Sequence, residues 1–178
     1  MKHLIFLSLF FSFVPVTKAQ NNLGKALKEQ LVNDWELAKS YTNEYLNAMP
    51  AEKYGFRPQD SIRSFAEQML HLAQVTSAMV ANGTGSPRLF AKGRPLEQTR
   101  TAHTKDSVMY YVNAGYDYAI KATQNMDESK WEEKVKERSM EETRFGWLLK
   151  AFAHQVHHRG QTTIYLRLLG IKPPKYVE

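Results

Sequence analysis

Along most of this chain, apolar residues recur at intervals of three and four, which is the spacing of one face of an α-helix. In the first such segment the recurring positions are Leu31, Trp35, Ala38, Tyr41, Tyr45 and Leu46. Proline is absent from residues 22–49, and Pro50 follows directly. We therefore predict a long amphipathic helix over residues 22–49 that ends before Pro50.

Three more helices are predicted by the same spacing and by their end signals. Ser64 and Glu67 have the spacing of a capping box and start a helix that extends to about Asn82, where glycines follow. A third helix has Thr104 as its N-cap and continues to about Gln124. A fourth spans about Glu141 to Leu169 and is ended by a glycine and a proline pair.

The stretches between these helices differ in character. Residues 83–103 carry three glycines and two prolines, and this connection is long enough to be a crossover or a loop that covers a site. The highly charged residues 127–143 are typical of a solvated loop or helix face. Strict apolar–polar alternation is not seen, so strands are not expected, and we predict an all-α four-helix bundle.

The N-terminal residues have a different pattern. A basic start, an apolar run from Leu4 to Val14 and a small-residue context ending at Ala19 predict a secretory signal peptide over residues 1–19. No later run approaches the roughly 18 apolar residues of a membrane helix. We therefore expect an exported protein, periplasmic or extracellular, that does not insert in the membrane after cleavage and whose single domain covers residues 20–178.

Composition narrows the chemistry. The chain lacks cysteine, which excludes disulfides, thiolate ligands, a cysteine nucleophile and a lipidated N-terminal cysteine. Removing Lys2 and Lys18 with the signal leaves 22 basic and 18 acidic residues, a net charge of +4 instead of +6. This excess is mild and lacks an arginine-rich arm, so nucleic-acid binding is not expected.

Three histidines fall within five positions of the fourth predicted helix. His154 and His158 are four residues apart, so their imidazoles lie one turn apart on the same face and can reach one metal ion. His157 lies about 80° from the middle of that face and flanks it. Taken alone, such a pair leaves two interpretations open, a metal site or ordinary surface and hydrogen-bonded histidines.

A distant histidine has a weaker case. His71 lies in the second predicted helix, about 140° from its apolar line on a helical wheel. That line is formed by Phe65, Met69, Leu72, Thr76 and Met79. Helical position alone favours an exposed His71.

The two histidine segments together resemble a known family. "MLHLAQV" at residues 69–75 and "HQVHHRGQTTIYLRLLGIKPP" at residues 154–174 are similar to the DinB-like (damage-inducible) family, which has a histidine in helix two and an H-x-x-x-H-R-G-Q run in the last helix. The resemblance implies that His71, His154 and His158 are metal ligands. It also implies an up-down-down-up order of the helices and allows a homodimer.

The expected function is inferred from this resemblance and from the three histidines. Three imidazoles without cysteine suit zinc or nickel and leave a position open to water or substrate, as in catalytic sites. We expect a metal-dependent enzyme, a hydrolase or a group transferase, acting on an unidentified small molecule. The family also contains thiol-dependent transferases and isomerases, although a reduced thiol would be scarce outside the cytoplasm. The alternative is a non-catalytic metal-binding or interaction bundle.

Two further residues are candidates for the catalytic machinery. Gln161 follows His158 by one turn and is expected to orient a substrate or a bound water. Glu67 precedes His71 by one turn and is expected to accept a hydrogen bond from its ring. Arg159 points away from the histidine pair and is expected to form a structural ion pair.

Overall fold

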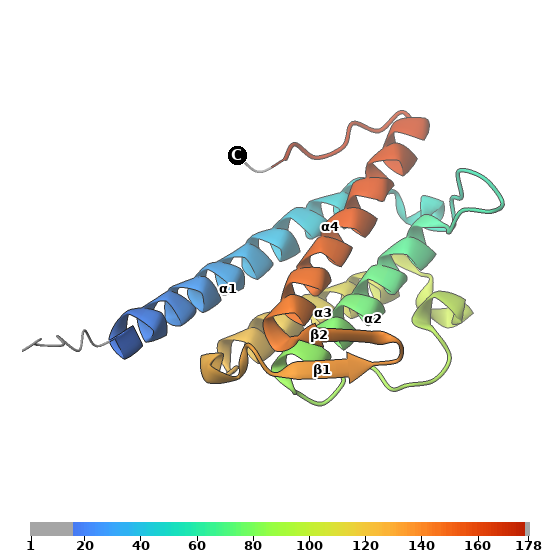
Figure 1. Cartoon of the computed structure of the whole chain (residues 1–178). Helices are drawn as coiled ribbons and strands as arrows, with labels where there is room; N and C mark the ends of the chain where they lie inside the picture. Colours follow the sequence, from blue (N-terminus) through green and yellow to red (C-terminus); the bar gives the residue numbers. More distant parts are fainter. Residues whose placement is uncertain (1–15, 177–178) are drawn as a thin grey trace, which may run out of the picture.

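The structure, a computed structural model, describes residues 16–176, with side chains from residue 23 onward (Figure 1). The predicted signal peptide over residues 1–19 thus lies mostly outside the described residues. Within them, the long helices are α1 (Val16–Ala48), α2 (Phe65–Thr84), α3 (Lys105–Gln124) and α4 (Arg144–Leu168). Short 3-10 turns cover η1 (Ala51–Lys53), η2 (Leu96–Gln98), η3 (Arg100–Ala102) and η4 (Glu128–Lys130).

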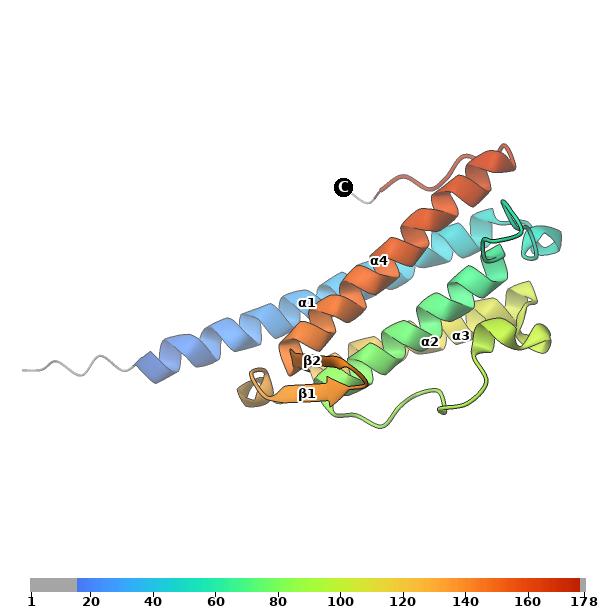
Figure 2. The same cartoon turned by 45° about the vertical axis from the view of Figure 1, so that its right-hand side comes forward.

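The four helices form a bundle in which α2 and α3 run in the same direction. Figures 1 and 2 show α1 rising, α2 and α3 both descending, and α4 rising again. Helix α2 packs against α3 and α4, and α1 packs against the same two helices. The predicted all-α four-helix bundle with up-down-down-up order is confirmed.

Local signals place the helix ends. The Ser64 side chain accepts from the backbone N–H of Glu67 while the Glu67 carboxylate accepts from the N–H of Ser64, which is a complete capping box. Thr104 caps α3 by accepting from the N–H of Ser107. Gly85 follows α2 with a φ of 75°, a left-handed conformation that glycine adopts without a steric penalty.

Helices α2 and α3 approach closely through small residues. A Cβ added to Gly115 of α3 would lie 3.4 Å from the carbonyl oxygen of Ala73 in α2. Between the helices, side chains such as Trp35, Met69 and Leu148 are fully buried. Packing of the apolar helix faces therefore forms the core. Among residues 16–176, no helix is long and apolar enough to cross a membrane.

The charged segment before α4 is the main departure from the predicted fold. It contains two antiparallel strands, β1 (Lys134–Glu137) and β2 (Met140–Thr143), so the expectation of no strands is wrong. Helix α4 consequently begins at Arg144 rather than near Glu141. Val135 and Met140 are the only apolar residues of the two strands, so no alternating pattern marks them. Trp147 of α4 anchors the hairpin by donating from Nε1 to the Val135 carbonyl at 2.9 Å.

The long connection between α2 and α3 has both of its predicted roles. It returns along the bundle, so that α3 starts near the end where α2 begins (Figure 2). Its residues 88–93, Pro95 and Glu97 also line a cavity beside α2 and the hairpin. The connection is therefore a crossover that covers one side of a pocket.

Candidate metal centre

Helices α2 and α4 bring together the three histidines that were predicted as ligands. One ring nitrogen from each of His71, His154 and His158 lies within 4.8 Å of the other two. The ring centroids are 4.3 Å apart for the α4 pair, and 4.7 and 5.4 Å separate His71 from His158 and His154. Distances of this size allow all three imidazoles to face one ion.

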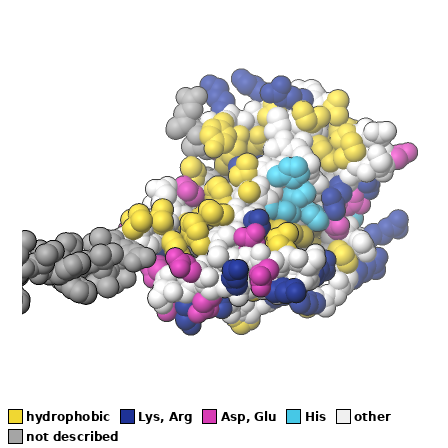
Figure 3. All heavy atoms as spheres, in the orientation of Figure 1, with side chains coloured by type: hydrophobic (Ala, Val, Ile, Leu, Met, Phe, Trp, Pro, Cys, Tyr) yellow, Lys and Arg dark blue, Asp and Glu magenta, His cyan; other side chains and the backbone are white. Residues whose placement is uncertain are grey.

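The position of His71 differs from the one that its helical wheel favours. Only 21% of its side chain is exposed, because α2 is buried on two sides, one against α3 and one against α4. The apolar line of α2 forms part of its buried surface. His71 lies on the side of α2 that packs against α4. Figure 3 shows that the histidine cluster is nevertheless reached from outside on this face of the molecule.

Each of the three rings has a polar partner at Nδ1. The Glu97 carboxylate lies 2.6 Å from Nδ1 of His71, the Thr76 hydroxyl lies 3.0 Å from Nδ1 of His154, and the Gln68 amide nitrogen lies 2.9 Å from Nδ1 of His158. These contacts leave the Nε2 atoms available for a shared ligand. A partner at the second nitrogen fixes both the orientation and the proton position of a ligating histidine.

These partners were not found from the sequence. Gln68 and Thr76 are buried polar residues on α2, and their burial in an otherwise apolar surface is the signal that would have identified them. Glu97 lies in η2, inside the long connection, where no periodicity places a side chain. Arg63 holds this carboxylate through bonds of 3.0 and 3.3 Å.

The three histidines are neutral at physiological pH. Burial, together with the neighbouring histidines, lowers the pKa of His154 to about 3 and that of His158 to about 4. Burial also lowers the pKa of His71, although the Glu97 carboxylate opposes part of this shift. A neutral imidazole is the form that binds metal ions, so protons do not compete for the site near pH 7.

Glu67 does not have the contact that was expected of it. Its carboxylate oxygens accept two bonds of 2.8 Å from Arg57 and one of 2.7 Å from the N–H of Ser64. Glu67 is thus committed to the start of α2, and the acidic partner of His71 is Glu97. The physical reason is local, because a capping box directs the glutamate side chain back toward the helix start.

Gln161 and His157 lie at the margin of the cluster. Gln161 is exposed, accepts a hydrogen bond from the Gln68 amide and lies 3.0 Å from Nε2 of His157. His157 is itself exposed and outside the three-histidine group. Gln161 therefore touches the polar shell of the site through Gln68, which keeps its predicted role open.

Arg159 also differs from its predicted environment. It is buried, and its guanidinium donates to Gln155 Oε1 at 2.8 Å and to Thr42 Oγ1 at 3.3 Å. It also lies 4.7 Å from the centre of the Tyr41 ring. Within residues 23–176 it forms no ion pair, and polar and aromatic contacts surround it instead.

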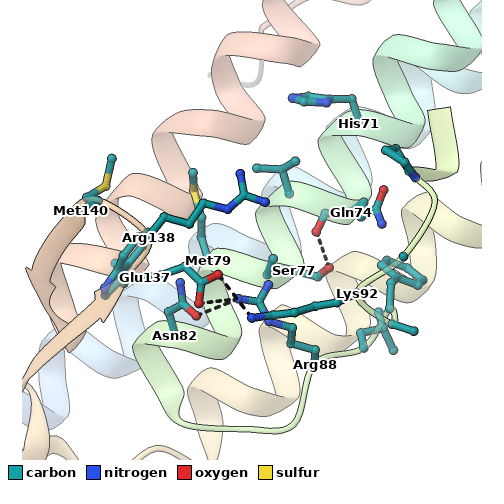
Figure 4. Close-up of a pocket in the computed structure, with 18 of the residues that line it drawn as sticks. His71, Gln74, Ser77, Met79, Asn82, Arg88, Lys92, Glu137, Arg138 and Met140 are labelled. Atoms are coloured by element: carbon teal, nitrogen blue, oxygen red, sulfur yellow. Dashed lines mark hydrogen bonds and ion pairs between the residues drawn. The ribbon is translucent and has the colours of Figure 1, made fainter. Parts of the chain in front are cut away.

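A cavity of about 710 Å³ adjoins the cluster at His71. It extends along α2 to the β1–β2 hairpin and is covered by the connection before α3 (Figure 4). Glu97 lines it beside His71, and Gln74 follows one turn further along α2. The volume lies within the roughly 300–1,000 Å³ of small-molecule sites, so the histidine cluster has a neighbouring space that can hold an organic molecule.

Comparison with known proteins agrees with this geometry. Residues 19–177 match the sequence profile of the DinB family. A crystal structure of a DinB-like protein from Bacillus cereus superimposes with a TM-score of 0.69 at 17% identity, covering 84% of this chain and 97% of the other. A DinB-like protein from Bacillus subtilis gives 0.61 at 15% identity, covering 83% and 96%.

At such low identity these two structures show a shared fold and nothing finer. No curated protein matches the chain in sequence. The family membership and the three-histidine group are compatible with a metal-binding site.

Proposed function

Because this chain belongs to the DinB family, we propose that it is a metal-dependent enzyme, a hydrolase or a group transferase. His71, His154 and His158 would hold one divalent cation, with zinc or nickel the best match to three neutral imidazoles. The observation that carries the proposal is the convergence of three neutral rings, one buried and two half-buried, whose Nδ1 atoms all have partners.

The donor set fits a metal bound through Nε2. Such binding requires Nδ1 to carry the proton, and the Glu97 carboxylate and the Thr76 hydroxyl can both accept a hydrogen bond from that N–H. Gln68 meets the same requirement when its amide rotates by half a turn and presents Oε1 to His158, with the Gln161 amide also rotating so that it donates to Gln68 instead of accepting. All three polar partners are therefore compatible with neutral rings that ligate through Nε2.

The remaining chemistry is divided between the ion and the chain. When bound, a divalent metal supplies Lewis-acid chemistry, activating water or polarising a carbonyl or a similar group. The Arg63–Glu97 pair orients His71. Gln161 offers an exposed amide beside the site, and the cavity at His71 offers space for a substrate. Metal-dependent hydrolysis and group transfer both use this combination of an accessible ion and an adjoining pocket.

Metal content tests the first half of the proposal. Untagged protein is loaded with zinc or nickel, freed of excess ion and measured by mass spectrometry. We expect one ion per chain in the wild type and in the matched control His157→Ala. We expect its loss in His71→Ala, His154→Ala and His158→Ala. Retention of the ion in all three variants, or its absence from the loaded wild type, would refute the site.

An exchangeable ligand position distinguishes an enzyme from a structural or metal-capture bundle. Cobalt(II) replaces the metal, and its visible spectrum is recorded with added azide and with a small thiol. An open position gives a new spectrum that saturates with the added ligand. A cobalt spectrum that neither ligand changes would indicate an ion fully ligated by protein, which supports the non-catalytic alternative.

Export is a separate part of the proposal and rests on the N-terminal pattern. Expression of the full chain in a bacterial host, followed by fractionation and mass determination, tests it. The mature protein is expected outside the cytoplasm and to begin at Gln20. A full-length cytoplasmic product would contradict the predicted signal peptide.

A further inference from the structure

The cavity beside the histidine cluster has a polar end at each side. At one end lie His71 and Glu97, next to the three-histidine group. At the other end the turn of the β1–β2 hairpin contributes Glu137 and Arg138. Figure 4 shows the Arg138 side chain extending from the hairpin across the pocket toward α2. A ligand that fills this space would therefore meet the Arg138 side chain, whose backbone lies at the end away from the metal centre.

The carboxylates of the pocket are already paired with other groups. Glu137 binds Arg88 at 3.1 Å and Lys92 at 3.4 Å, as the dashed lines of Figure 4 show. Glu97 is held by Arg63 and His71. In the described part of the chain Arg138 has neither an ion pair nor a side-chain hydrogen bond. Arg138 is therefore the cation of this pocket that can bind an incoming anion.

The backbone of Arg138 supports a role beyond the turn itself. Arg138 and Ser139 form a two-residue hairpin loop, and Arg138 has a φ of 58°. It is the only non-glycine residue with positive φ in the described chain. Hairpin loops of this length favour glycine, asparagine or aspartate at positive φ, and a larger residue there is strained. Strain of this kind is common where a side chain serves a binding site.

Between the two ends the pocket wall is largely apolar. Met79 of α2, Phe90 of the connection and Trp147 of α4 line it, together with Leu89 and Met140. Leu89 and Met140 are large apolar side chains that are 38% and 43% exposed, so they present contact surface to a ligand. Such a wall favours an apolar ligand body over a small hydrated ion.

We propose that this pocket binds an organic anion with an apolar body, whose carboxylate, sulfonate or phosphate end is bound by Arg138. The opposite end of the ligand points toward His71 and the metal centre. The proposal names the substrate class of the proposed enzyme. Only the placement of the second end of the ligand at the metal centre rests on the proposed function. Anion binding at Arg138 requires no metal.

A pair of fluorescent probes separates charge from apolar contact. Anilinonaphthalenesulfonate carries a sulfonate, whereas N-phenylnaphthylamine has a similar aromatic body without charge. Both are titrated into the full domain after chelation of metals, at low and high salt. We expect Arg138→Gln and Arg138→Gly to weaken sulfonate binding about tenfold, the size of a lost charge-assisted contact, with little effect on the neutral probe. Arg138→Gly keeps the turn intact because glycine suits the positive φ.

Two further variants locate the effect. Lys136→Gln removes a neighbouring exposed charge of β1 that does not line the pocket, and it should leave both affinities within about twofold, since surface charges act weakly. Ala78→Phe places a ring in the pocket and should weaken both probes. An equal loss in Lys136→Gln and Arg138→Gln, or unchanged binding in Ala78→Phe, would overturn the proposal.

The outcome is independent of the metal assay. Sulfonate affinity that depends on Arg138 in metal-free protein supports the pocket even if no ion binds the histidines. If one ion binds per chain but sulfonate affinity does not depend on Arg138, the metal centre is supported and the proposed substrate class is refuted.

Discussion

The Glu97 carboxylate lies 2.6 Å from Nδ1 of His71 and joins the connection before α3 to the histidine cluster on α2 and α4. Because Arg63 holds the same carboxylate, His71 is oriented from outside its own helix. This contact gives the long connection a function in the metal centre in addition to its role as a crossover.

Replacing Glu97 should weaken metal binding without removing any ligand. A carboxylate that accepts from a ligating histidine typically contributes about 10- to 100-fold in affinity, and Glu97→Gln is expected to lose an amount in that range. Glu67→Gln is the matched control, since Glu67 contacts Arg57 and the start of α2 instead. Competition with a chromophoric zinc chelator measures both affinities, and equal values for the two variants would contradict this role of Glu97.

The buried histidines predict how the metal-free protein responds to acid. The pKa of His154 is about 3 in the folded protein, whereas the unfolded chain has the ordinary value of 6.5. Below pH 6.5 the unfolded state binds the proton more readily, so stability is present above that pH and falls as the pH decreases toward 3. Each such histidine contributes a slope of at most about 1.4 kcal/mol per pH unit.

Urea unfolding of the metal-free protein between pH 7 and pH 5 checks this slope. His154→Gln should flatten the dependence by up to one proton, and the exposed-site control His157→Gln should not. A wild-type slope that His154→Gln leaves unchanged would show that His154 does not titrate as its burial implies.

Two helix glycines, Gly160 in α4 and Gly83 in α2, should respond differently to alanine. A Cβ on Gly160 of α4 would meet no atom within 4 Å, so Gly160→Ala should stabilise the protein by about 0.5–1 kcal/mol through higher helix propensity. A Cβ on Gly83 would lie 2.8 Å from Leu148 and 2.9 Å from the Arg144 carbonyl, and Gly83→Ala should cost about 1–3 kcal/mol. Denaturant unfolding measures the change in the free energy of unfolding for both variants. A loss of stability in Gly160→Ala would contradict the open space around its Cβ.

Arg138→Gly should preserve or raise stability while it impairs anion binding. Glycine relieves the strain at a φ of 58°, and its greater entropy in the unfolded chain offsets part of that gain, so the net change is at most about 1 kcal/mol. Urea unfolding tests this beside the probe titrations. A clear loss of stability would mean that Arg138 is retained for the hairpin and not for a ligand.

Helices and their ends were predictable because their signals are local. The recurring apolar positions around Trp35, the Ser64–Glu67 capping box and the Thr104 cap each depend on residues within a few positions of one another. The pairing of His154 with His158 is local for the same reason, since four residues make about one turn. Only the family resemblance added His71, and the predicted contact of Glu67 with it proved wrong.

The sequence by itself thus determined four amphipathic helices and one face that carries two histidines. Tertiary structure decided the rest: that α2 is buried on two sides and directs His71 to α4, and that Glu97 crosses from a loop to meet it. It also decided that the charged segment forms a hairpin, anchored by Trp147, which extends Arg138 into a pocket. The histidine and pocket contacts join residues far apart in the chain, and neither helical period nor charge pattern encodes which distant surface a side chain will meet. The hairpin is local, but its charged strands carry no apolar alternation that would mark them.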